Sequence, residues 1–316
     1  MRKVIPFVMS ILLGLPVAAL AGAYPEKPIQ MVVPYNPGGG SDISARIISD
    51  RLKSILPQPV VVTNINGAAG GLGAMNVKRA RADGYTLLWE HPTMSITPLV
   101  TKTDYDWEGF EPVCMVASSP TALVVRGDSP FKSAPEAFAA IKSEPGKYRW
   151  PMALNGVSQF TFLYIQDATG IEPMAVPAVS DKARILSLLG GNGEITTVTY
   201  SSAVPYEKSG DLRILAMVAK ERSPFAPDLP TLKEQGIDAS YDFRYSVFAP
   251  KGTPAEVIKV LNDAFKKVMA DPATEKALME QSITSFYRDT PEMVRVWEAE
   301  DALNRKVAEK HGLLIK

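Results

Sequence analysis

The chain has 316 residues, with 34 Lys and Arg against 34 Asp and Glu. Because the two signs balance and form no long run, neither a nucleic acid nor a membrane surface is an expected partner. Cys114 is the only cysteine, which excludes an intramolecular disulfide. It lies in the apolar run 112–117, which predicts a buried structural thiol and not a reactive one.

The first 23 residues have the pattern of a secretory signal peptide. Arg2 and Lys3 precede the apolar run 4–20, and A-x-A motifs end at Ala21 and Ala23. A membrane anchor needs about 20 apolar residues, whereas two prolines interrupt this run. We therefore expect cleavage after Ala21 or Ala23 and export to the periplasm. No cysteine follows the run for a lipid anchor.

Strand-like and helix-like segments alternate in the rest of the chain. The patterns predict strands at 29–34, 59–63, 85–89, 123–125, 195–199, 212–218 and 246–249, and helices at 41–56, 135–142, 158–168, 182–189, 255–269 and 275–281. This alternation predicts an α/β fold of mostly parallel sheets flanked by helices.

The length of the exported part indicates two lobes, because about 290 residues exceed what one hydrophobic core fills. Proline-containing segments interrupt the pattern near Pro120 and at Ser223-Pro224. We predict a first lobe of residues 24–120 plus 224–316 and a second lobe of residues 121–223. The C-terminal segment would then return to the first lobe.

A glycine-rich turn joins the first predicted strand to the first predicted helix. Its glycines, Gly38, Gly39 and Gly40, let the backbone N–H groups approach a ligand. Ser41 is the predicted N-cap of the helix, and Asp42 follows in its first turn. The start of a helix carries free N–H donors and partial positive charge, which suits a carboxylate or a phosphate. An ordinary capped βα turn explains the same residues, and both interpretations remain open.

Several blocks resemble the substrate-binding proteins of tripartite tricarboxylate transporters, the TctC-like or Bug family. They are VPYNPGGGSDISAR (33–46), PVVV (59–62), GAAGGLGA (67–74), ADGYTLL (82–88), LLGG (188–191), RSP (222–224), PDLPTL (227–232) and APKGTP (249–254). The resemblance implies a two-lobed periplasmic-binding-protein fold, type II-like, that closes on a ligand in the cleft between its lobes. It also implies delivery of a small carboxylate to a permease with one large and one small membrane subunit.

The resemblance also implies which positions contact the ligand. One loop is the glycine-rich turn, a second is 155–159 in the other lobe, and others follow the strands near residues 90 and 177. The predicted contacts are Tyr35, Gly38, Gly39, Gly40, Ser41, Asp42, Thr93, Asn155, Ser158, Gln159, Ser180 and Asp181.

The chain departs from the family pattern at two places. Ala178 to Asp181 replaces the usual Tyr-Lys-Gly, and Gln159 lies near a usual His. Arg244 stands where many members carry Trp, and either a second-carboxylate contact or a solvated charge at a strand edge would explain it.

Enzyme motifs are weak in this sequence. The glycines of 67–73 are followed by Asn76 where a dinucleotide-binding turn needs glycine, and no Walker or Gly-x-Ser-x-Gly motif occurs. His91 and His311 are the only histidines and form no metal-ligand pattern. We expect a monomeric binding protein without catalysis, cofactor or metal. The alternatives are a secreted α/β hydrolase acting through His91 or Asp42, and a ligand sensor for a membrane receptor.

Overall fold

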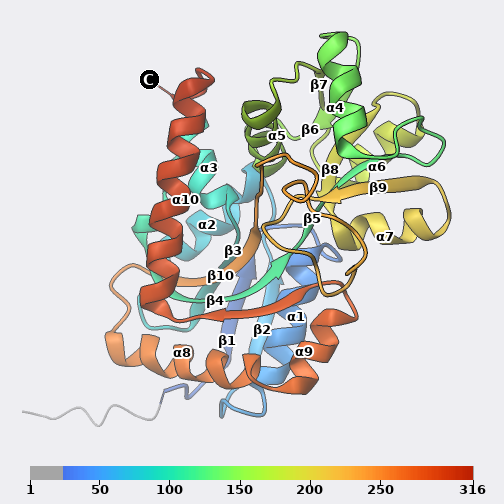
Figure 1. Cartoon of the computed structure of the whole chain (residues 1–316). Coiled ribbons are helices and arrows are strands. Elements are labelled where there is room, and N and C mark those ends of the chain that lie inside the picture. Colours follow the sequence, from blue (N-terminus) through green and yellow to red (C-terminus); the bar gives the residue numbers. More distant parts are fainter. Residues whose placement is uncertain (1–23, 316) are drawn as a thin grey trace, which may run out of the picture.

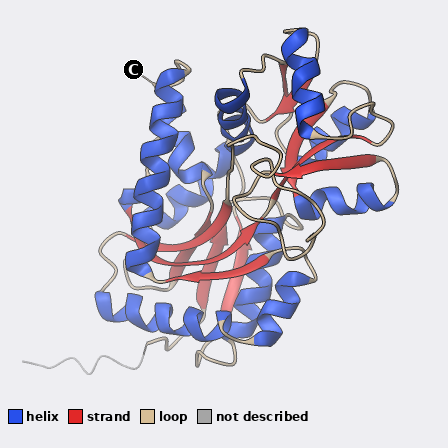
Figure 2. Cartoon of the chain, viewed as in Figure 1, coloured by secondary structure: helices blue, strands red, loops and turns tan. Residues whose placement is uncertain are grey.

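A computed structural model describes residues 24–315 of the chain. The predicted signal peptide, residues 1–23, lies outside the described residues. The fold has two α/β parts that lie side by side, a larger one around a six-stranded sheet and a smaller one around two short sheets (Figure 1). Helices enclose the sheets of both parts (Figure 2). This is the α/β class that the sequence predicts.

The larger part is built on a mixed sheet with the strand order β11-β4-β10-β3-β1-β2. β1 pairs in parallel with β2 and β3, whereas β10 is antiparallel to both β3 and β4, and β11 is antiparallel to β4. The strands are β1 (Ile29–Val33), β2 (Val60–Asn64), β3 (Thr86–Glu90), β4 (Phe110–Ser119), β10 (Phe243–Pro250) and β11 (Thr284–Arg288).

Helices cover both faces of this sheet, because its side chains alternate between two apolar cores. One face packs against α1 (Gly40–Leu52), α8 (Ala255–Met269) and α9 (Pro272–Met279). The other face packs against α2 (Gly71–Lys78), α3 (Thr93–Val100) and α10 (Thr290–Lys310). Short 3-10 turns occur at Ala68–Gly70 and Trp107–Gly109.

The smaller part contains a three-stranded sheet, β8-β5-β9, and the pair β6-β7. Its strands are β5 (Thr121–Arg126), β6 (Arg149–Met152), β7 (Met174–Pro177), β8 (Ile195–Thr199) and β9 (Leu212–Met217). Its helices are α4 (Ala134–Ser143), α5 (Val157–Thr169), α6 (Asp181–Leu189) and α7 (Tyr200–Lys208).

The chain passes between the two parts twice. β4 runs into β5 across Pro120, and the segment after β9 returns the chain to β10. The strands of the larger part therefore lie within residues 29–119 and 243–288. Those of the smaller part lie within residues 121–217. Leu232 to Tyr241 pack with the smaller part, as do the ends of α3 and α10. The division at Ser223-Pro224 stays a prediction.

The prediction of mostly parallel sheets is wrong in its strand directions. β5 is antiparallel to both β8 and β9, and three of the five pairings in the larger sheet are antiparallel. Alternation of strands and helices does not fix strand direction here. β4 and β5 are consecutive, and β10 and β11 re-enter the larger sheet from elsewhere in the chain. α2, α3, α7, α10, β6, β7 and β11 were not predicted.

Cys114 is fully buried in β4, and burial raises the pKa of its thiol, which confirms the prediction of a structural cysteine. Among residues 24–315, no helix is both long and apolar enough to cross a membrane.

Candidate ligand-binding site

Asp42 organises the glycine-rich turn between β1 and α1. Its Oδ2 accepts a hydrogen bond from the backbone N–H of Gly38 at 2.9 Å. Its Oδ1 accepts from Arg46 Nε and Asn64 Nδ2, both at 2.9 Å. Burial acts to raise the pKa of Asp42, but these hydrogen bonds outweigh it and lower the pKa. Asp42 is therefore an ionised anchor of the loop, and Asn64 was not anticipated from sequence.

The glycines leave the start of α1 open. The N-cap residue is Gly39 and not Ser41, because the helix already begins at Gly40, so the prediction of a Ser41 cap is wrong. Gly39 supplies no side-chain cap, and the first N–H groups of the helix lack that partner. Gly38 has φ +80, a conformation that favours glycine. A Cβ on Gly40 would lie 2.8 Å from the hydroxyl oxygen of Tyr245, so any other residue there would force the Tyr245 side chain to shift. Gly38 and Gly39 are exposed at this open end.

Tyr35 connects the loop to the end of β3. Its hydroxyl donates a hydrogen bond to Glu90 Oε1, and its ring stacks on His91 with centroids 4.2 Å apart. His91 also contacts Phe243, with ring centroids 4.4 Å apart. Neighbouring residues in a strand point to opposite faces, but β3 ends at Glu90, and both side chains here contact Tyr35.

Glu90 and His91 are buried neutral groups at neutral pH. Burial raises the pKa of Glu90 to about 8, although hydrogen bonds from Tyr35 and the His91 N–H act to lower it. Burial lowers the pKa of His91 to about 3. The contact of 3.9 Å between His91 Nδ1 and Glu90 Oε1 is therefore not an ion pair at pH 7. A base with such a low pKa is a poor proton acceptor, which argues against hydrolysis through His91.

Thr93 is the first residue of α3 and is buried beside this cluster. Its backbone N–H donates to His91 Nδ1 over 3.4 Å, which fixes that ring nitrogen as an acceptor. Thr93 is thus linked to His91 through its backbone.

The second predicted loop, 155–159, surrounds the start of α5 in the smaller part. Ser158 Oγ accepts from the Ala153 N–H at 2.8 Å, and Gln159 Oε1 accepts from the Asn155 N–H at 2.6 Å. Gly156 is the N-cap of α5 and again provides no side-chain cap. α5 therefore begins as α1 does, with a glycine cap and free backbone donors.

Ser180 and Asp181 lie at the start of α6, and both have structural partners. Ser180 Oγ caps the helix by accepting from the Ala183 N–H at 3.1 Å. Asp181 accepts from Thr199 N at 3.0 Å, from Thr199 Oγ1 at 2.5 Å, and from Arg184. Thr199, at the end of β8, was not anticipated from the sequence.

Tyr245 links the loops of the two parts. Its hydroxyl lies against Gly40, and its pKa is raised by burial and then by the nearby carboxylate of Asp181. In the smaller part, the Ala178 N–H donates to Met152 O at 2.8 Å, so the loops after β6 and β7 begin next to each other. Tyr245 thus lies against the glycine-rich turn and within the electrostatic influence of Asp181. Tyr245 was not predicted as a site residue. The only sequence signal for it is that it is an aromatic residue next to Arg244.

Arg244 points away from this site. Its guanidinium pairs with Asp242 at 2.5 Å and with Glu300 of α10 at 2.6 Å. Side chains alternate along β10, so Arg244 faces α10, while Phe243 and Tyr245 face His91 and Trp89. Neither predicted interpretation of Arg244 describes it, because it is half-buried and held by two carboxylates.

The second glycine-rich segment, 67–73, is a packing feature. It forms a 3-10 turn and the start of α2, and a Cβ on Gly73 would lie 2.6 Å from Pro34 Cβ. Gly73 therefore lets α2 approach the end of β1 closely. Among residues 24–315 no group of three or more metal-ligating side chains was found.

The sequence model of the tripartite tricarboxylate transporter family receptor, TctC, matches residues 44–313. Protein BugT of Bordetella pertussis is 31% identical over 294 residues, covering 91% of this chain and 90% of that protein. A UPF0065 protein from the gbd 5' region of Cupriavidus necator is 31% identical over 306 residues, covering 96% of this chain and 93% of that protein.

Solved structures have the same fold. A TctC solute-binding protein from Polaromonas aligns with a TM-score of 0.77 at 29% identity, covering 91% of this chain and 99% of that one. R. palustris Rpa4515, solved with adipate, aligns with a TM-score of 0.83 at 28% identity, covering 92% and 98%. MatC from Rhodopseudomonas palustris, solved with malate, aligns at 0.79 and 26% identity, covering 90% and 99%. The predicted family and two-lobed fold are thereby confirmed, and the chain belongs to the TctC family of solute-binding receptors of tripartite tricarboxylate transporters.

Proposed function

We propose that this protein captures a small carboxylate in the periplasm and delivers it to the membrane subunits of a tripartite tricarboxylate-type transporter. Family membership supports solute binding, and the adipate and malate complexes of two relatives support a carboxylate. The observation that carries the proposal is the pair of glycine-capped helix starts, at Gly39 of α1 and Gly156 of α5.

The carboxylate would accept hydrogen bonds from the open end of α1, at Gly39, Gly40 and Ser41. The second contact would come from the start of α5, where Ser158 and Gln159 already accept backbone hydrogen bonds and keep their own protons free to donate. Each charge-assisted hydrogen bond contributes roughly 1.5–3 kcal/mol, so a few of them account for micromolar binding after the cost of association.

The nearby cations are already paired, which limits the charge of the ligand. Arg46 is held by Asp42 and Arg184 by Asp181. Backbone dipoles must therefore supply the positive potential for the carboxylate. Asp42 has the role of fixing the loop, because a second carboxylate would repel the ligand.

The experiment is a thermal-shift screen of the protein without residues 1–23, refolded to remove carried-over ligand. The panel contains dicarboxylates, tricarboxylates, keto acids and aromatic carboxylates. A ligand at 100 times its Kd adds about 2.7 kcal/mol of stability. A binding protein returns the compound unaltered, whereas a hydrolase would convert it, so the recovered compound is also analysed. No shift from any carboxylate would overturn the proposal.

Ser158→Ala tests the site with a matched control. Ser158 and Ser133 each accept one backbone N–H through Oγ, from Ala153 at 2.8 Å and Glu136 at 3.4 Å. Only Ser158 lies in the proposed site. We expect Ser158→Ala to weaken carboxylate binding about tenfold and Ser133→Ala to change only stability. Equal binding by both variants would contradict the assignment of Ser158.

A further inference from the structure

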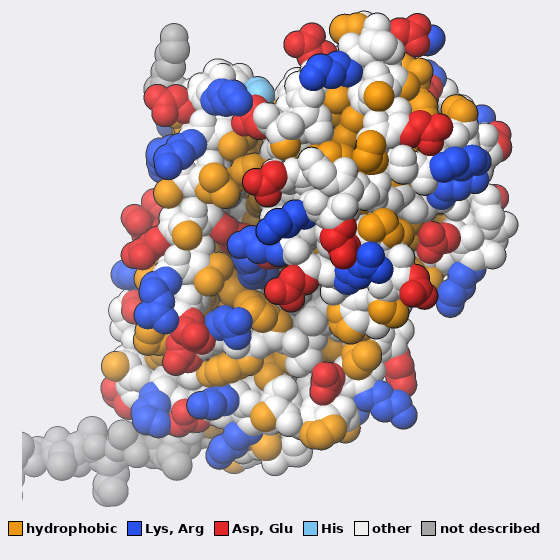
Figure 3. Space-filling model, in the orientation of Figure 1, with side chains coloured by type: hydrophobic (Ala, Val, Ile, Leu, Met, Phe, Trp, Pro, Cys, Tyr) orange, Lys and Arg blue, Asp and Glu red, His pale blue; other side chains and the backbone are white. Residues whose placement is uncertain are grey.

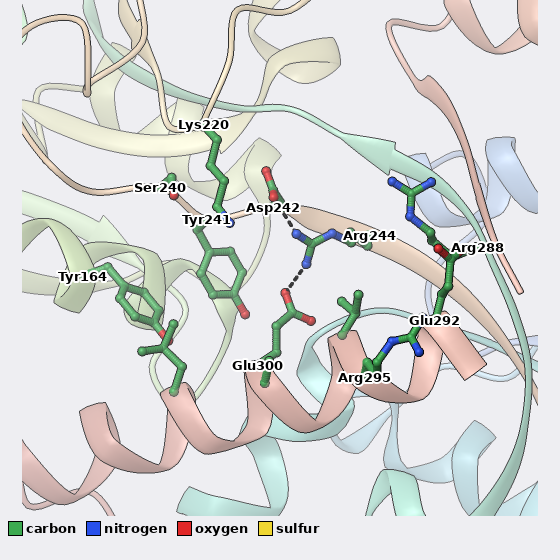
Figure 4. A pocket seen from close by; sticks show the side chains of 13 residues that line it. Tyr164, Lys220, Ser240, Tyr241, Asp242, Arg244, Arg288, Glu292, Arg295 and Glu300 are labelled. Carbon is green, nitrogen blue, oxygen red and sulfur yellow. Dashed lines mark hydrogen bonds and ion pairs between the residues drawn. The ribbon is translucent and has the colours of Figure 1, made fainter. Parts of the chain in front are cut away.

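A cavity of about 410 Å³ lies between α10 and the segment 240–244 that returns the chain to β10. Figure 4 shows its walls, with Tyr164 from α5, Lys220 from the segment after β9, Arg288 from the end of β11 and Arg295 from α10. The volume is within the range of small-molecule sites. We call it the crossover cavity, because both parts of the molecule contribute to it where the chain crosses between them.

The crossover cavity is separate from the carboxylate site. Arg244 lines the cavity, while its neighbour Tyr245 contacts Gly40 on the opposite face of β10. Ser246, two residues beyond Arg244 on the same face, accepts a hydrogen bond from Trp297 Nε1 of α10 at 3.1 Å. The strand thus lies between the two sites.

The charges of the cavity favour an anion. Arg244 pairs with Asp242 and Glu300, at 2.5 Å and 2.6 Å, and offsets one of their two negative charges. Burial also raises the pKa of Glu300 to about 7, although Arg244 acts to lower it. In the described part of the chain, Lys220, Arg288 and Arg295 form no ion pair, while Glu292 is the one other acid of the lining. Basic side chains also gather near the middle of the face shown in Figure 3.

One wall of the cavity is apolar. Tyr164 and Tyr241 pack with ring centroids 5.5 Å apart, and Val296 and Leu303 of α10 line the cavity with them. Tyr241 is 6% exposed, so this wall is mostly ring surface, on which an apolar or aromatic body can pack.

We propose that the crossover cavity is a second ligand site, which binds a small organic anion with an apolar or aromatic body. The positive potential of Lys220, Arg288 and Arg295 attracts the anionic group, and the body packs on Tyr164 and Leu303. A second cavity of about 440 Å³ shares Lys220, Arg244 and Arg288 with the crossover cavity, so the two lie next to each other.

The test is a fluorescence titration with 8-anilinonaphthalene-1-sulfonate, an aromatic monoanion, on the protein without residues 1–23. We expect saturable binding of one dye per chain. Lys220→Gln with Arg295→Gln should weaken it at least tenfold. Lys306→Gln, an exposed cation of α10 outside the cavity, should leave the Kd within twofold.

A second pair of variants tests the volume. Ala299→Trp fills the cavity from α10, whereas Ala302→Trp adds the same side chain at an exposed position outside it. We expect at least a tenfold loss of dye binding for Ala299→Trp and less than a twofold change for Ala302→Trp. Unchanged urea unfolding of both variants establishes that the loss is local.

Two results would overturn the proposal. One is the absence of saturable dye binding by the wild-type protein. The other is loss of dye binding in Gly39→Glu, because that substitution places a negative charge at the carboxylate site and leaves the crossover cavity intact. The carboxylate screen and the dye titration are separate measurements. A negative result in one therefore does not overturn the proposal that the other tests.

Discussion

The carboxylate of Asp42 holds the backbone N–H of Gly38 at 2.9 Å, four residues before it in the chain. This hydrogen bond closes the glycine-rich turn on itself and directs the next N–H groups outward. The loop is therefore organised before any ligand binds, which reduces the entropy cost of binding.

Asp42→Asn should destabilise the protein by about 2 kcal/mol at pH 7, because the amide replaces an anion that accepts from Gly38, Arg46 and Asn64. The pKa of Asp42 is lowered, so its contribution is present above the usual value of 3.8 and is lost as pH falls below it. Urea unfolding at pH 7 and pH 3 measures both effects. The control is Asp50→Asn on the same helix, an exposed residue paired with Lys53, which should change stability by less than about 0.5 kcal/mol.

Gly40→Ala should destabilise the protein and weaken carboxylate binding, since the new Cβ would lie 2.8 Å from the Tyr245 hydroxyl. Tyr245→Phe removes that oxygen, so the double variant should recover about 1–2 kcal/mol relative to additivity. Gly39→Ala is the matched control, because its Cβ would meet only Asn36 O at 3.6 Å. Denaturant unfolding of the four proteins gives the coupling energy, and additive effects would contradict the contact.

Glu90→Gln should reduce the pH dependence of stability between about pH 4.5 and 8. The pKa of Glu90 is about 8 in the fold against 4.5 ordinarily, so the folded state binds the proton more tightly and loses stability as pH rises between these values. From pH 6.5 to 8 the loss should be on the order of 1–2 kcal/mol in the wild type and much smaller in Glu90→Gln.

Unfolding free energies of both proteins at several pH values make this comparison. The control is Glu298→Gln, at an exposed position of α10, whose unfolding free energy should depend on pH as that of the wild type does. His91 acts in the opposite sense, because its pKa is about 3 against 6.5, and its contribution is lost as pH falls through that interval. Parallel curves for wild type and Glu90→Gln would show that Glu90 is ionised in the fold.

Arg244→Gln should lower the free energy of unfolding by about 3 kcal/mol, because it leaves Asp242 and Glu300 without their cation in a partly buried position. The comparison is Arg305→Gln, an exposed residue of α10 that lies 3.5 Å from Asp301, where we expect less than about 1 kcal/mol. Thermal or denaturant unfolding distinguishes the two. A similar small cost for both would mean that the Arg244 pairs are solvent-screened.

The sequence by itself determined the family and those local elements that have a clear apolar pattern. The helix 255–269 is predicted with its observed bounds, because its apolar residues repeat at helical spacing, and the strands 29–33 and 195–199 follow from short apolar runs. The glycine-rich turn and its open helix end also follow from local backbone chemistry. α10 was missed although it is the longest helix within residues 24–315, because its exposed residues dilute the apolar periodicity.

The tertiary structure decided everything that joins distant segments. Strand direction at β5 and β10 depends on where the chain crosses between the parts, which local periodicity does not encode. The link from Gly40 to Tyr245 and Asp181, and the pairing of Arg244 with Glu300, bring together residues separated by 56 positions or more. The neutral states of Glu90 and His91 arise from burial, which exists only once the chain has folded.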